Sequence, residues 1–113
     1  MKETTRRGKG LTEAQARTLV LSLPEATEGA HMGHPDFRVR KKIFASFSHD
    51  RRMMNMKVDS TALEMMVRAD PETFKDVWGG RWIGVRLARI GKKDLKGLLM
   101  DAWRATAPKD LLP

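Results

Sequence analysis

The residues that most clearly suggest a function are the cations between residues 31 and 57. This stretch holds seven Lys or Arg against two Asp, and the whole chain carries a net charge of +8. Cations at this density favour phosphates or other anionic surfaces. The blocks 1–10 and 80–113 are also basic, whereas 11–30 and 58–79 are acidic. The uneven distribution predicts a positive face and a polyanionic partner.

A second group, His31, His34 and Asp36, offers three possible metal ligands within six residues. Structural zinc usually takes four ligands, and the chain has no cysteine that could complete the set. Residues i and i+3 of a strand point to opposite faces, so the two histidines converge only if a turn at 33–35 allows it. We therefore expect no metal and no other cofactor.

Enzymatic motifs are missing from the sequence, which has no G-x-S-x-G, P-loop or H-E-x-x-H. The acidic residues fall at expected helix caps and helix faces, where they stabilise the N-terminal ends of helices. None forms an obvious acid–base pair with a histidine. We expect a non-enzymatic protein without catalytic residues.

The elements that position the cations follow from hydrophobic spacing. Thr12 and Gln15 form a capping box ahead of a helix at about 13–22. Asp59 or Ser60 caps a second helix, which ends at Asp70. The strongest apolar stripe predicts a helix over about 93–105.

Strands are expected where apolar and polar residues alternate with a period of two. They fall near 27–32, at 37–39, at 43–47, at 53–58 and at 82–90. Residues 71–80 are expected to form a loop. Together these elements predict an α+β fold of two layers, an antiparallel sheet of about five strands with helices packed on one face, in the order α-β-β-β-β-α-β-α.

The opposite face of this sheet is expected to be partly open. By alternation it would display the side chains of Arg38, Arg40, Phe44, Ser46, Ser48, Met53, Asn55, Lys57, Trp82 and Arg86. Aromatic residues on an exposed sheet can stack on bases while Arg and Lys hold phosphates. Trp82 has a second interpretation, which we favour, in which it packs against a loop that includes Trp78 or against the N-terminal arm.

Several segments together resemble a known family. They are GHPDFRV at 33–39, KIFA at 42–45, the Trp82–Leu87 strand and AWRATAPK at 102–109. In this order and spacing they resemble the MmcQ/YjbR-like proteins over roughly residues 11–112. The resemblance implies a compact α+β domain of the CyaY-like or secretion-chaperone-like kind. It also implies DNA binding through a double-wing arrangement of β-hairpins, here Arg38–Phe47 and the turn at His49–Met53.

The nucleic-acid contacts that we predict are mainly to phosphates, so sequence specificity should be modest. The candidate residues are Arg38, Arg40, Lys41, Lys42, Arg51, Arg52, Lys57, Trp82 and Arg86. An alternative is that the turn cations are only solvated and block edge-to-edge pairing of strands. Another is a protein-interaction or chaperone-like module, possibly homodimeric, that uses the exposed sheet face.

The domain organisation expected for these 113 residues is a flexible basic arm at 1–10 and a single domain at 11–113. No apolar run approaches the ~20 residues of a membrane span. The charged N-terminus also lacks the apolar stretch of a secretory signal. We therefore expect a cytoplasmic protein that does not bind a membrane.

Overall fold

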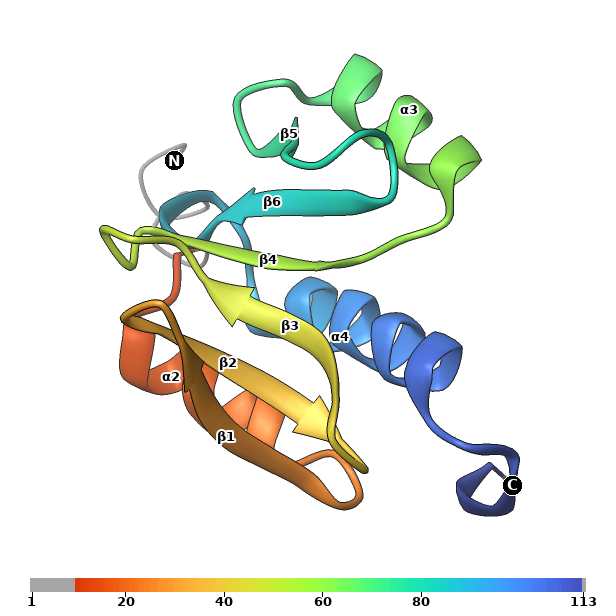
Figure 1. Cartoon of the computed structure of the whole chain (residues 1–113). Helices are drawn as coiled ribbons and strands as arrows, with labels where there is room; N and C mark the ends of the chain where they lie inside the picture. Colours follow the sequence, from red (N-terminus) through yellow and green to blue (C-terminus); the bar gives the residue numbers. More distant parts are fainter. Residues whose placement is uncertain (1–9, 113) are drawn as a thin grey trace.

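The structure, a computed structural model, describes residues 10–112 of the chain (Figure 1). Six antiparallel strands form one sheet in the order β1-β2-β3-β4-β6-β5. The strands are β1 (Ala26–His31), β2 (His34–Val39), β3 (Lys42–Phe47), β4 (Met53–Lys57), β5 (Phe74–Asp76) and β6 (Trp82–Arg86). The helices are α2 (Glu13–Leu21), α3 (Ser60–Ala69) and α4 (Lys92–Thr106), with short 3-10 turns at Leu87–Arg89 and Lys109–Leu111. The predicted α+β class is confirmed.

Two helices cover one face of the sheet. The α2 and α4 helices pack on each other, and α4 also packs on β3 and β4. The third helix, α3, lies beside β5 at the edge of the sheet (Figure 1). The other face of the β1–β4 region carries no helix in this view, so its side chains form a separate surface.

The helix caps are those that the sequence predicts. The Thr12 hydroxyl accepts the Gln15 N–H at 3.1 Å, and the Gln15 side chain accepts the Thr12 N–H at 2.9 Å. Asp59 caps α3 by accepting the Ala62 N–H at 3.1 Å. These bonds satisfy backbone donors that have no partner within the first turn of a helix.

The sheet has six strands instead of about five because the segment expected as a loop at 71–80 contains β5. The β5–β6 connection, residues 77–81, contains a tight turn in which Gly79 and Gly80 both have positive φ, at 56° and 85°. This is the conformation that type I′ hairpin turns require and that glycine adopts most easily. The expected strand at 82–90 is shorter, because Leu87–Arg89 forms a 3-10 turn.

A β-bulge in β3 makes the predicted facing of the side chains at the start of this strand wrong. Phe37 pairs with Ala45, whereas the next residue, Arg38, pairs with Ile43, so Phe44 is the extra residue. One extra residue reverses the facing of every side chain before it. Phe44 is therefore fully buried and Ile43 lies on the open face, the opposite of the prediction.

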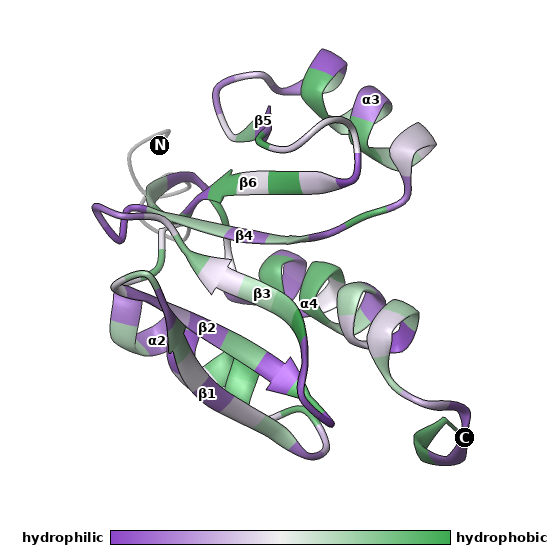
Figure 2. Ribbon diagram, in the orientation of Figure 1, coloured by the Kyte–Doolittle hydropathy of each residue, from purple (hydrophilic) through white to green (hydrophobic). Residues whose placement is uncertain are grey.

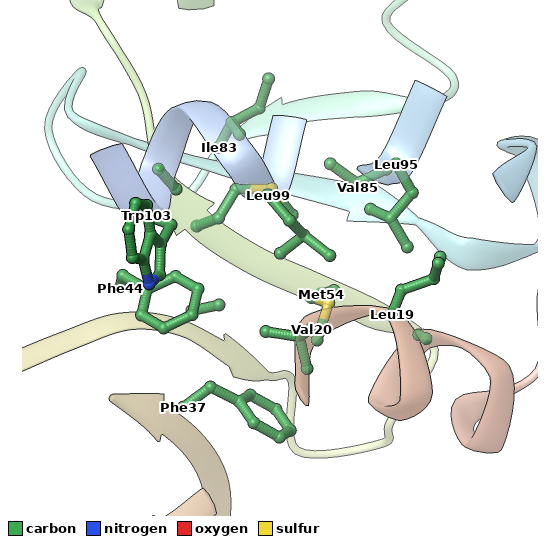
Figure 3. Packing of buried hydrophobic residues seen from close by; sticks show 14 of the residues in the cluster. Leu19, Val20, Phe37, Phe44, Met54, Ile83, Val85, Leu95, Leu99 and Trp103 are labelled. Atoms are coloured by element: carbon green, nitrogen blue, oxygen red, sulfur yellow. The ribbon is translucent and has the colours of Figure 1, made fainter. Parts of the chain in front are cut away.

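The core lies between the sheet and the α2–α4 layer. Figure 3 shows the Phe44 ring beside Trp103 of α4, with Phe37 and Val20 further along the same layer. The indole N–H of Trp103 donates to the Pro24 carbonyl at 2.9 Å, which satisfies its one polar group.

The first described residues are bound to the segment that follows β6. The backbone N–H groups of Gly10 and Leu11 donate to the carbonyls of Ile90 and Leu87. The remainder of the expected basic arm, residues 1–9, lies outside the described residues. Among residues 10–112, no helix is both long and apolar enough to cross a bilayer.

Candidate functional site

The open face of the sheet carries a row of small and polar residues that crosses five strands. Gly29 pairs with Asp36, Asp36 with Ser46, Ser46 with Asn55, and Asn55 with Gly84. Side chains of directly opposed residues lie on the same face. None of these residues has a large apolar side chain, so the centre of the open face is not filled by packed side chains.

A cavity of about 790 Å³ lies over the middle of this row, at Asp36, Ser46 and Asn55, and we call it the open-face pocket. Its lining comprises His31, Met32, His34, Asp36, Ile43, Ser46, Phe47, Ser48, His49, Asn55, Trp78 and Trp82. Pockets that bind small organic groups usually measure about 300–1,000 Å³. The open-face pocket is therefore large enough for a ligand or a segment of a polymer.

Three histidines gather at one part of this lining. His31 and His34 form the last pair of the β1–β2 ladder, across a turn in which Met32 and Gly33 have positive φ. The His34 and His49 rings are 5.3 Å apart, edge to face. The residues of the H-x-x-H-x-D cluster, His31, His34 and Asp36, thus all line the open-face pocket. Within residues 10–112, however, no three His, Asp or Glu side chains are grouped closely enough to hold a metal ion.

Two tryptophans form another part of the lining. The Trp78 and Trp82 rings are 5.2 Å apart with planes at 78°, so they make an aromatic corner. Trp82 is half-buried, whereas Trp78 is 57% exposed. The interpretation that Trp82 packs against the loop containing Trp78 is correct, and the pair still faces the pocket.

The polar side chains at the floor of the pocket differ in whether they already have hydrogen-bond partners within the protein. Asp36 is 1% exposed, and both its oxygens accept from Arg38, at 2.8 and 3.0 Å. No side-chain hydrogen bond joins Ser46 or Asn55 to another described residue. Among the described residues, the fully buried unpaired polar atoms are Arg51 Nε and Thr106 Oγ1. The Asn55 amide therefore remains accessible from the pocket that it lines.

Three of the predicted nucleic-acid contacts are ion-paired within the protein. Arg38 binds Asp36, and this hydrogen-bonded carboxylate raises the pKa of the guanidinium. Arg40 donates to both carboxylate oxygens of Glu25 through Nε and Nη2, with Nη2 3.0 Å from Oε2. Arg40 also lies 3.5 Å from Asp110, and Arg51 lies 3.5 Å from Glu13. These three arginines are partly neutralised by their partners.

The other predicted cations have no ion pair to a described residue. They are Lys41, Lys42, Arg52, Lys57 and Arg86. Two of them belong to the open face, since Lys57 pairs with Trp82 across the β4–β6 ladder and Arg86 pairs with Met53. A cation therefore stands beside an aromatic ring of the pocket.

The two expected wings point away from each other. The β2–β3 turn has Arg40 and Lys41 at its tip, both with positive φ, whereas Arg51 and Arg52 lie in the β3–β4 turn. These turns flank the six residues of β3. At ~3.3 Å per residue they are separated by roughly 17 Å. Figure 2 shows the purple of hydrophilic residues at both turns, one at each end of β3.

Sequence reasoning missed most of the pocket. Trp78, Ser46, Asn55 and the histidines were not among the predicted contacts, although Ser46 and Asn55 were placed on the open face. A signal was available, because alternate turns of an antiparallel meander lie at the same end of the sheet. This rule brings His34, the first residue after the β1–β2 turn, to His49 in the β3–β4 turn.

Comparison with known proteins identifies the class of protein that this fold represents. The family model described as YjbR matches residues 21–105, more than half of the chain. The chain therefore belongs to the YjbR family, and the resemblance seen in its sequence is confirmed. No curated protein matches it.

A solved structure supports the fold. The crystal structure of Deinococcus radiodurans protein DR2400, with a domain described as DUF419, superposes with a TM-score of 0.76. The sequences are 19% identical, and the match covers 89% of this chain and 82% of the other. At this identity the similarity establishes a shared fold and leaves the activity open.

Proposed function

We propose that this YjbR-family protein binds nucleic acid, in the first instance DNA, through the open face of its sheet and without catalysing a reaction. The observation that carries the proposal is the position of Lys57 and Arg86. Both lie on the β4–β6 ladder that borders the open-face pocket, and neither pairs with an acidic group among residues 10–112. Free cations beside an aromatic surface suit a phosphate backbone and its bases.

The turn cations have a secondary role in this proposal. Lys41, Lys42 and Arg52 are exposed and unpaired within the described residues, so they extend the positive surface beyond the pocket. Arg38, Arg40 and Arg51 contribute less, because each already neutralises a carboxylate. The net charge of +8 draws a polyanion toward the protein at long range.

The test is fluorescence anisotropy with labelled duplex and single-stranded DNA over a salt series. One double variant, Lys57→Gln with Arg86→Gln, removes two open-face charges. A matched variant, Lys41→Gln with Lys42→Gln, removes two charges from the β2–β3 turn. On duplex DNA we expect the log–log salt slope to fall by ~0.9 for each phosphate that the variant no longer neutralises, and the open-face variant to lose more affinity.

A second candidate function is protein binding. It is favoured by Met32 and Trp78, which are 83% and 57% exposed at the lining of the open-face pocket. Exposed apolar residues around a concave surface are typical of interaction sites. If the folded protein binds neither form of DNA at low salt, the nucleic-acid proposal is wrong and this candidate takes its place.

A further inference from the structure

We infer that the open-face pocket receives an unpaired nucleobase, so that the protein prefers single-stranded nucleic acid to duplex. This inference rests on the proposed nucleic-acid binding and specifies which form is bound. Bases in a duplex are stacked and paired, and a protein pocket can reach their faces only when they are unstacked.

The aromatic corner supplies the stacking surface. Trp78 projects from a tight glycine turn and is more than half exposed, while Trp82 is held in β6 and meets it at 78°. A planar base placed in this corner can stack on one ring and contact the other. Stacking of one base on an aromatic side chain strengthens binding by roughly five- to 150-fold.

The floor of the pocket supplies groups that suit the edge of a base. The Asn55 amide offers both a donor and an acceptor, and the Ser46 hydroxyl offers either. Neither side chain hydrogen-bonds to another residue in the described chain, and both line the cavity. Asn55 is only 8% exposed, so a base that reached it would be shielded from water.

The charge at the pocket is arranged for a phosphate chain on its border rather than inside it. The Asp36 carboxylate on the floor is neutralised by Arg38, which leaves the floor without a free anion. Lys57 lies beside Trp82 and Arg86 beside Met53, at the two ends of the β4–β6 ladder whose middle carries Asn55 of the floor. A backbone that followed these two cations would bring its bases toward the tryptophans.

The experiment compares three probes of equal length: a single strand, the same strand with abasic sites throughout, and a duplex. The abasic strand keeps the phosphates and lacks the bases. We expect the single strand to bind about tenfold more tightly than the abasic strand, which corresponds to stacking of one base. Trp78→Ala should remove this difference while leaving the affinity for the abasic strand unchanged.

A matched control is Met65→Ala, since Met65 is 65% exposed on α3 and does not line the pocket. It should alter none of the three affinities. Thermal melting confirms that each variant is folded. Equal binding of all three probes by the wild type would overturn the inference and leave nucleic-acid binding in place. Absence of binding to any probe at low salt would overturn both.

Discussion

The two faces of the same sheet follow opposite rules. The face toward α2 and α4 is filled by large apolar side chains such as Phe37, Phe44 and Met54, all with no exposed surface. The open face carries small or polar residues at its centre, including Ser46 and Asn55. One face provides stability through packed volume, and the other leaves a cavity that its tryptophans and cations border. The candidate site therefore exists because large apolar side chains are missing from the centre of the open face.

The largest expected effect tests which face Phe44 belongs to. Phe44→Ala should lower the free energy of unfolding by about 3–5 kcal/mol, because it leaves a cavity beside Trp103. Ile43→Ala, on the partly exposed side of the bulge, should cost about 1 kcal/mol. Chemical denaturation measures both. Equal costs, or the reverse order, would mean that the two faces are not separated as the bulge implies.

The next effect concerns the one carboxylate within the polar row. Arg38→Ala removes the donor to both oxygens of Asp36 and should destabilise the protein, because it leaves that carboxylate buried and unpaired. Asp36→Ala should cost less, about 1–2 kcal/mol, since the freed guanidinium can turn to water. Denaturation of both single variants and the double variant gives the coupling energy. A coupling near zero would remove Arg38 from the structure of the floor and return it to the set of free cations.

A smaller effect tests how closely the open face is packed at its β6 end. A Cβ at Gly84 would lie 2.8 Å from the Met53 methyl and from a Val77 methyl. Gly84→Ala should therefore destabilise the protein by about 1–2 kcal/mol. Ser46→Ala, at the pocket floor, should change stability by less than about 0.5 kcal/mol. If both substitutions were neutral, the pocket would be wider at β6 than the structure indicates.

The smallest effect is the acid dependence of the Arg40–Glu25 pair beyond the pocket. Hydrogen bonding to Arg40 lowers the pKa of Glu25 below its usual value of 4.5. The pair therefore stabilises the fold above about pH 4.5, and this contribution disappears as the pH falls through the lower, folded-state pKa. Melting temperatures between pH 7 and 3 should fall less steeply for Arg40→Gln than for the wild type. Identical slopes would show that Arg40 is available to bind phosphate.

Local sequence determined most of the elements and the family. The Thr12–Gln15 box, the Asp59 cap and the apolar stripe of α4 are short-range patterns, and each produced the helix that it predicts. Alternation placed Met54 and Met56 in the core and Asn55 on the opposite face. Short elements depend more on context, so the three residues of β5 were not predicted.

Tertiary structure decided which residues form the candidate site. A single extra residue in β3 reversed the expected facing of Ile43 and Phe44, because side-chain direction in a strand depends on the register with the next strand. Partners distant in sequence decided which cations are free, as Glu25 does for Arg40 across fifteen residues. The pocket itself joins turns and strands that meet only after the sheet has formed. Charge and periodicity are properties of the chain, whereas a cavity and an ion pair exist only in the fold.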